Sequence, residues 1–355
     1  MPVPRSEELN RTTFPRRDPD VAPSWRYVPG RALRRFADDG FTDFVGSLSF
    51  RGLLALFPGL IAFVSVLGLF GQSEDAVLRL LNEAEEVTPE HSWDAVRPLL
   101  ETLLRTQSAG LGLAIGLVTT LWAASGYVKT FSRTMNAVYG TREGRGALRW
   151  NLHMYLLTVL FMLLIAVGFT GVLLGGPVAE AVGAFIGLQS VVLTVWKYTR
   201  WVVVFLAVVL LVGLLYRTTP NVRLRRGPDG RRTGWVSVGS FVAIVMTVVA
   251  TMLFLFYVAK VPYYSSTYGA LAGVIVLMLW MFIVNAALVF GAVVDGEMER
   301  VRQLREGLAA EETLYLQLRD TRGTDRREIR AARDVERARE VRRSVGGGED
   351  AGDEM

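Results

Sequence analysis

The sequence predicts an all-α integral membrane protein with a bundle of six transmembrane helices. Apolar residues make up 51% of its 355 residues, and they are gathered in blocks rather than spread as in a soluble domain. Each block is about as long as the roughly 20 residues that a helix needs to cross a bilayer. The predicted spans are 44–70, 111–128, 152–175, 191–216, 236–259 and 270–294.

The basic residues predict how the spans are oriented. Of the 39 Lys and Arg residues, 32 fall in the N-terminal arm, the second and fourth loops and the C-terminal tail, and four fall in the other loops. Cytoplasmic loops retain Lys and Arg whereas outer loops lack them. We therefore expect both termini in the cytoplasm. Lys occurs at only three positions, a bias typical of GC-rich bacteria, which favours the bacterial inner membrane.

The segments around the membrane domain, 44–294, each have their own pattern. In the arm, 1–43, aromatic residues alternate with arginines after position 24, which predicts a short interfacial helix leading into the first span. The acidic first loop, 71–110, has two amphipathic stretches separated by a proline, which predicts an outer helical hairpin. Residues 295–355 are predicted to form a charged cytoplasmic helical tail with a disordered acidic end.

Several classes of chemistry are not supported by the sequence. No cleavable signal peptide precedes the first span, so we expect that span to insert the chain. Without cysteine, disulfides and thiolate metal sites are excluded. The two histidines, His91 and His153, fall on opposite predicted sides and cannot share a metal. No catalytic motif is found, so we expect no enzyme, no metal and no cofactor. The basic excess on one face favours anionic lipid headgroups over nucleic acid.

Arg51 is the most unusual residue of the predicted spans. A charge near the bilayer centre costs about 2.5–3.5 kcal/mol, so such residues usually face a polar cavity and mark function. The alternative is that the span begins near Gly52 and that Arg51 extends to the inner headgroups. Pro58, seven residues later, is expected to bend this helix, either to open a cavity or to fit a neighbour.

Other polar residues lie at the predicted boundaries or inside the bundle. Asn285 is in the middle of the last span, where an amide is expected to bond across the bundle or to contact a substrate. Arg217 and Asn221 follow the fourth span at the inner face, and Tyr268 precedes the last span on the outside. Glu297, just past the inner boundary, is expected to be solvated and to pair with Arg300 or Arg217.

Glycines spaced four residues apart occur in several spans and are expected to allow close helix packing. The packing could be within one chain or between two copies, so the glycines are compatible with both a monomer and a homo-oligomer. The pairs are Gly112 and Gly116, Gly171 and Gly175, and Gly269 and Gly273.

Three segments together resemble the YihY/BrkB family of bacterial inner-membrane proteins. They are an aromatic-rich start ending in Leu-Phe-Pro at 56–58, a Trp-Ala-Ala-Ser-Gly stretch followed by Asn-Ala-Val-Tyr-Gly at 122–140, and 215–221 together with 264–280. The resemblance covers about residues 30–300, and position 51, more often aromatic in the family, departs from it. The motif residues are Pro58, Trp122, Ser125, Gly126, Asn136, Tyr139, Pro220, Tyr264, Gly269, Gly273 and Trp280.

This resemblance implies a six-helix inner-membrane protein linked to envelope integrity. One branch is associated with moving lipid A precursors and another with serum resistance, while no catalytic residues are agreed for the family. Members were once labelled ribonuclease BN. Two histidines predicted on opposite sides argue against that label, because such nucleases need clustered His and Asp ligands for paired metals.

The leading hypothesis is therefore a membrane protein that binds or translocates an anionic lipid. Arg51, Arg217 and Asn221 are expected to meet the headgroup, with Asn285 and Tyr268 lining the path. The first alternative is a non-catalytic membrane anchor whose tail recruits a cytoplasmic partner. The second is a ribonuclease, for which metal-dependent RNA cleavage would be lost on His153→Ala.

Overall fold

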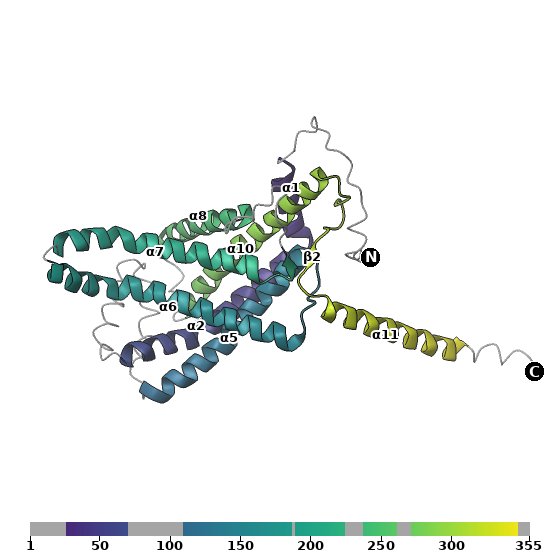
Figure 1. Ribbon diagram of the computed structural model, residues 1–355, viewed down its shortest axis with the longest axis horizontal. Coiled ribbons are helices and arrows are strands. Elements are labelled where there is room, and N and C mark those ends of the chain that lie inside the picture. The colour runs from purple at the N-terminus through teal and green to yellow at the C-terminus, as the bar shows by residue number, and fades with distance from the viewer. Residues whose placement is uncertain (1–25, 70–108, 187–188, 224–236, 261–270, 347–355) are drawn as a thin grey trace, which may run out of the picture.

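The computed structural model describes residues 26–69, 109–186, 189–223, 237–260 and 271–346, and helices dominate them (Figure 1). The only strands among these residues, β1 (Val222–Arg223) and β2 (Gln317–Leu318), form a short antiparallel ladder. The helices are α1 (Tyr27–Asp38), α2 (Phe41–Leu69), α5 (Ala109–Val138), α6 (Ala147–Ile186), α7 (Gln189–Thr218), α8 (Val238–Lys260), α10 (Leu271–Arg305) and α11 (Arg322–Gly346).

Six long helices coincide with the six predicted spans, namely α2, α5, α6, α7, α8 and α10. Four of them, α6, α7, α8 and α10, are long and apolar enough within the described residues to cross a membrane. The chain is therefore a multi-pass α-helical membrane protein, because helices satisfy their own backbone groups in lipid. That α2 and α5 also cross stays a prediction.

The helices extend beyond the predicted spans. α6 continues to Ile186 and α7 begins at Gln189, so most of the predicted third loop, 176–190, is helical. The last span likewise continues as α10 to Arg305. Hydropathy marks where a helix leaves lipid, whereas the backbone bonds of a helix continue past that point. The predicted outer hairpin, 71–110, lies outside the described residues.

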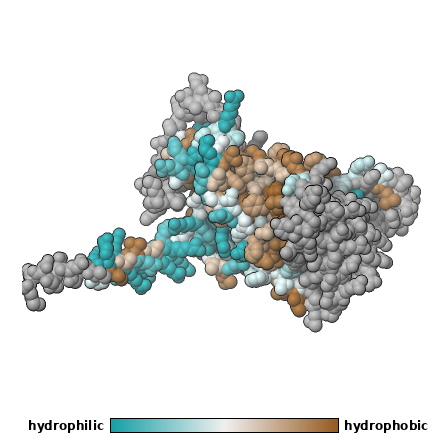
Figure 2. Space-filling model, turned by 180° about the vertical axis from the view of Figure 1, so that it is seen from behind, coloured by the Kyte–Doolittle hydropathy of each residue, from teal (hydrophilic) through white to brown (hydrophobic). Residues whose placement is uncertain are grey.

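Charged segments gather at one end of the bundle, which we call the polar end (Figure 1). It comprises α1, the last turns of α5, α7 and α10, the first turns of α6 and α8, and residues 306–346. Figure 2 shows hydrophilic residues at this end and hydrophobic residues on the adjoining helices. Arg31 of α1 donates to the carbonyl of Glu311, 3.2 Å away, so the described parts of both terminal regions lie on the same side of the bundle.

The outward faces of α7 and α8 are strongly apolar. Trp201 on α7 is 61% exposed, and Phe241 and Phe256 on α8 are 61% and 65% exposed. Apolar surface of this size is unfavourable in water and marks contact with lipid or with another protein. It is consistent with helices that cross a membrane.

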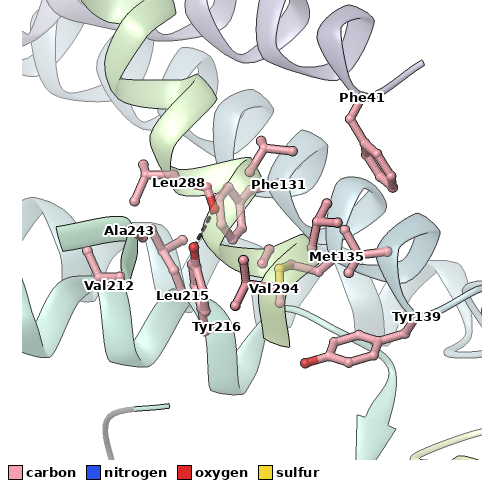
Figure 3. Close-up of a cluster of buried hydrophobic side chains, with 14 of the residues drawn as sticks. Phe41, Phe131, Met135, Tyr139, Val212, Leu215, Tyr216, Ala243, Leu288 and Val294 are labelled. Atoms are coloured by element: carbon pink, nitrogen blue, oxygen red, sulfur yellow. Dashed lines mark hydrogen bonds between the residues drawn. The ribbon is translucent and has the colours of Figure 1, made fainter. Parts of the chain in front are cut away.

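The buried core of the described residues lies close to the polar end. Phe131 and Met135 of α5 pack with Leu215 and Tyr216 of α7 (Figure 3), and the Phe131 and Tyr216 ring centroids are 6.0 Å apart. The Tyr216 hydroxyl donates to the carbonyl of Leu288 on α10. This bond satisfies a buried phenol and joins α7 to α10.

α8 and α10 pack closely where Gly239 faces Gly291. A β-carbon at Gly239 would collide with the Gly291 carbonyl oxygen, and one at Gly291 would collide with the Gly239 carbonyl oxygen. Asp295 of α10 accepts hydrogen bonds from the Ser237 hydroxyl and, at 2.7 Å, from the Gly239 amide. The carboxylate thus caps the start of α8, where the helix dipole favours negative charge.

We predict that Gly239→Ala destabilises the protein, by about 1–3 kcal/mol, because the added methyl group collides with backbone that cannot move away cheaply. Gly46→Ala in α2 is the matched control, since a β-carbon there meets nothing within 4 Å; it should leave stability unchanged or raise it by up to about 1 kcal/mol. Thermal unfolding in detergent measures both. Equal midpoints for the two variants would contradict the close packing.

Candidate functional site

Glu297 of α10 is the most deeply buried acid of the polar end, with 0% of its side chain exposed. Arg35 of α1 approaches one carboxylate oxygen at 2.9 Å, and Arg31 of α1 approaches the other at 2.9 Å. Arg300, one turn along α10, completes the cluster at 3.3 Å. The prediction that Glu297 pairs with Arg300 is confirmed, whereas the expected solvation is wrong because α1 covers this carboxylate.

Each arginine of this cluster also donates to a backbone carbonyl. Arg35 donates to Val138 at the end of α5, at 2.7 Å, and Arg300 donates to Ala310 and Glu311 after α10. One carboxylate therefore holds α1, α5, α10 and the chain that follows α10 in a single network. The three ion pairs and these carbonyl bonds offset the cost of burying the Glu297 charge.

A second network joins the loop after α5 to the chain after α7. The backbone N–H of Asn221 donates to Asn136 Oδ1 at 2.8 Å, and Asn136 Nδ2 donates to Glu143 at 3.0 Å. Arg145 forms an ion pair with Glu143 at 2.7 Å and donates to the Thr219 carbonyl. Asn136 and Asn221, both buried, thus connect the ends of two helices.

The tail completes this network through Arg319. Its guanidinium donates to the carbonyls of Arg217, Thr218 and Val222, the last at 3.0 Å. These carbonyls lie at and just beyond the end of α7, where a cation offsets the negative end of the helix dipole. The Asn221 side chain also donates to the Asp320 carbonyl at 2.9 Å. Residues up to about 320 are therefore part of the packed body.

Asp320 marks the point where the tail leaves the body. Hydrogen bonds from the side chain and backbone of Arg322 lower the pKa of the Asp320 carboxyl to about 2. The carboxylate is therefore ionised throughout the physiological pH range, and it would be neutralised only near its lowered pKa. α11 begins at Arg322, directly after it.

Asn285 lies inside the bundle, where three helices meet. Its side-chain oxygen accepts the Tyr127 hydroxyl of α5 at 2.8 Å, and its Nδ2 donates to Ser49 of α2 at 3.3 Å and to Met281 at 2.8 Å. Asn285 is 2% exposed. The interhelical bonding predicted for this amide is present, and its oxygen and nitrogen are both used within the protein.

Arg51 lies against Gly126 of α5. A β-carbon at Gly126 would be 2.9 Å from an Arg51 guanidinium nitrogen, so the glycine creates the space that the guanidinium fills. Gly126 is two residues from the end of the predicted second span. Arg51 is therefore close to the predicted inner boundary rather than to the bilayer centre, which favours contact with headgroups.

Two more cations continue along the same face of α5. Lys129 lies over the Tyr155 ring of α6 with 4.1 Å from Nζ to the centroid, and Arg133 lies over Trp150 at 5.8 Å. Positions 126, 129 and 133 share one helix face. We call Arg51, Lys129 and Arg133 the α5 cation stripe. Cation–π contacts of this kind contribute about 0.5–1 kcal/mol at exposed sites.

The α5 cation stripe differs in its partners from the arginines around Glu297 and Glu143. Among the described residues, no carboxylate lies within ion-pair distance of its three members, whereas Arg31, Arg35, Arg145 and Arg300 all have one. Trp122, one turn before Gly126 and 71% exposed, continues the stripe with apolar surface. The arrangement offers positive charge beside an exposed apolar face.

The five residues predicted to form the lipid site do not lie together in the structure. Arg51 is near Asn285: its neighbour on α2, Gly52, lies against Met281 of α10, and Ser49 of α2 bonds to Asn285. Asn221 and the Arg217 backbone belong to the network around Arg319 instead. Tyr268 lies outside the described residues, as do the motif residues Tyr264 and Gly269.

Most of the described motif residues make contacts within the bundle. Ser125 donates to the Trp122 carbonyl at 2.8 Å, and Trp280 of α10 donates to Thr251 of α8 at 3.2 Å. Tyr139 and Pro220 are buried. α2 continues as one helix through Pro58, and α10 includes Gly273.

Sequence reasoning missed the covering of Glu297 by α1, the role of Arg319 and the Gly239–Gly291 contact. The first two join residues more than 95 positions apart in the sequence, and no local pattern indicates such pairs. Gly239 and Gly291 lie on different helices and lack the four-residue spacing that marks pairs on one helix.

These features define a class, the multi-pass α-helical membrane proteins with their charged residues gathered at one end. Within it, residues 32–313 match the model of the family described as virulence factor BrkB. The chain belongs to this family, which confirms the resemblance seen in the motif residues. No solved structure matches the chain.

Curated relatives cover most of the chain. The putative ribonuclease-like protein YfkH of Bacillus subtilis is 27% identical over 257 residues, which are 72% of this chain and 90% of the relative. A UPF0761 membrane protein of Verminephrobacter eiseniae is 28% identical over 274 residues, 76% of this chain and 61% of the relative. This chain therefore spans about three fifths of that relative's length. A UPF0761 membrane protein of Alteromonas mediterranea is 25% identical over 280 residues, which are 77% of this chain and 88% of the relative.

Glu297→Gln is predicted to destabilise the protein, by about 3–5 kcal/mol, because it leaves three arginines around a buried neutral amide. Glu336→Gln is the matched control; Glu336 is 51% exposed and pairs only with Arg339 at 3.4 Å in the described residues, so its loss should cost at most about 1 kcal/mol. Thermal unfolding in detergent compares the two. A Glu297→Gln midpoint as high as that of the control would show that the cluster does not stabilise the polar end.

Proposed function

We propose that this protein binds the headgroup of an anionic lipid at the α5 cation stripe, as a bacterial inner-membrane protein that contributes to envelope integrity. The observation that supports the proposal is the set of three cations without a carboxylate partner among the described residues. They lie near the predicted inner boundary of the membrane, beside exposed apolar side chains. An anionic lipid has the matching chemistry, a negative headgroup joined to apolar chains.

The geometry suggests how a lipid would be held. Arg51 and Arg133 present guanidinium groups, which bind phosphate oxygens through paired donors. Lys129 lies on α5 between Arg133 and Gly126, the residue that Arg51 of α2 contacts. The acyl chains would follow α5 away from the polar end, past Trp122 and the exposed Leu156 of α6. Tyr155 and Trp150 orient two of the cations by stacking.

Movement of the lipid between leaflets would use the interior of the bundle. The polar side chains inside it, Ser49, Tyr127 and Asn285, are bonded to each other, so a headgroup would have to replace these bonds to pass. We therefore propose binding as the primary activity. Translocation extends it and requires α2, α5 and α10 to separate near Asn285.

The test is native mass spectrometry of the protein purified in mild detergent. Wild type should retain an anionic lipid, and Arg51→Ala should retain about tenfold less, because a charge-assisted contact contributes at least about 1.4 kcal/mol. Lys129→Ala should act in the same direction. Arg149→Ala is the matched control, since Arg149 is an exposed cation of the polar end outside the stripe. Equal retention in all four proteins, or losses that only follow folded yield, would remove the site.

A second candidate function, recruitment of a cytoplasmic partner, is favoured by α11. This helix extends from the polar end away from the bundle (Figure 1), and it lies beyond the family match, which ends at residue 313.

Deleting 322–355 separates the two functions, because residues up to about 320 pack into the body and must be kept. A lipid-binding protein should keep its lipid and its envelope phenotype after this deletion. A recruiting protein should lose the phenotype while lipid retention is unchanged. A complementation assay in a strain lacking the protein, run beside native mass spectrometry, gives both readouts.

A further inference from the structure

α11 has an arginine stripe on one face. Arg326, Arg330, Arg333 and Arg337 are spaced by four, three and four residues, which places them on one side of a helix over about 16 Å. All four are exposed. We call them the α11 arginine stripe.

The stripe has no carboxylate partner in the described part of the chain, although α11 itself contains acidic residues. The ion pairs in this region are Arg322 with Asp320 and Arg339 with Glu336, neither of which includes a stripe residue. Three of the acids of α11, Asp325, Glu328 and Glu336, lie away from the stripe on the helical wheel, whereas Asp334 and Glu340 flank it on either side. The stripe is therefore a positive surface with one acid at each edge, and α11 extends away from the bundle (Figure 1).

The segment directly after α11 has the complementary charge. Residues 347–355 read Gly-Gly-Glu-Asp-Ala-Gly-Asp-Glu-Met, with four acids and no basic residue. The acids occur as two pairs, 349–350 and 353–354. Three consecutive glycines, 346–348, provide the backbone freedom for a reversal of the chain.

The lengths match as well. An extended chain spans roughly 3.3 Å per residue, so the first acid pair reaches about 10–13 Å from Gly346 and the second about 23–26 Å. Along the helix, at 1.5 Å per residue, Arg337 lies about 13 Å from Gly346, Arg333 about 20 Å and Arg330 about 24 Å. The first pair therefore reaches Arg337, and the second reaches Arg333 and Arg330.

We propose that the acidic segment 349–354 binds back onto the α11 arginine stripe of the same chain. The stripe is then a docking surface for extended acidic peptides, and segment 349–354 occupies it. Both parts lie beyond residue 313, where the family match ends, so this device is an addition to the membrane domain. The inference is independent of the lipid site.

The experiment measures how strongly the full-length protein in detergent binds a fluorescein-labelled hexaglutamate peptide at low salt, by anisotropy. Neutralising the segment (Glu349→Gln, Asp350→Asn, Asp353→Asn and Glu354→Gln together) should tighten binding about tenfold, because the internal competitor is removed. The gain should disappear in 0.5 M salt, where exposed charges are screened.

Two four-arginine variants, each added to the neutralised segment, locate the effect. Arg326, Arg330, Arg333 and Arg337→Gln should abolish the gain. Arg327, Arg339, Arg342 and Arg343→Gln remove the same charge elsewhere on α11 and should keep most of it. Glutamine is a good helix former, and circular dichroism checks that α11 persists.

Three results would overturn the proposal. Unchanged affinity after neutralising the segment would show that it does not occupy the stripe. Equal losses in both four-arginine variants would show an effect of net charge alone. A gain that varies with protein concentration would show binding between copies instead of within one chain.

Discussion

The buried carboxylate of Glu297 is the constraint on which the polar end depends. This fully buried carboxylate forms ion pairs with two arginines of α1 and one of α10, and Arg35 extends the network to the end of α5. Removing α1 would leave this charge facing water or lipid with fewer partners, which is costly. The N-terminal helix is therefore held as a structural element of the bundle, and is more than an amphipathic segment on the membrane surface.

With the polar end fixed in this way, its cations divide by partner. Those that face the interior, such as Arg145 and Arg300, bond to carboxylates and to the carbonyls of neighbouring chain segments. Those of the α5 cation stripe contact aromatic rings or a glycine and have no carboxylate within reach in the described residues. A cation near the predicted membrane boundary that has no carboxylate partner among the described residues is a candidate to bind a ligand. This division is what separates a candidate headgroup site from structural ion pairs.

The parts that sequence predicts well are those governed by local physics. Hydropathy and length locate the long helices, and the Asn285 amide was expected to bond across the bundle, as it does with Tyr127 and Ser49. Contacts set by tertiary packing were not foreseeable. In the sequence Glu297 has the pattern of an ordinary boundary acid, and only the packing of α1 buries it. Arg319 similarly lies in a charged stretch, and its role follows from where α7 ends.

The position of Arg51 in the structure changes how its charge is interpreted. In the sequence it is a charge inside an apolar block. In the structure it fills the space left by Gly126, at the level where α5 approaches the predicted inner boundary. A charge at that depth costs less than one at the bilayer centre, so it can be gained without a dedicated cavity. Lys129 and Arg133 lie on the face of α5 that Arg51 contacts at Gly126, so the proposed headgroup site does not depend on Arg51 alone.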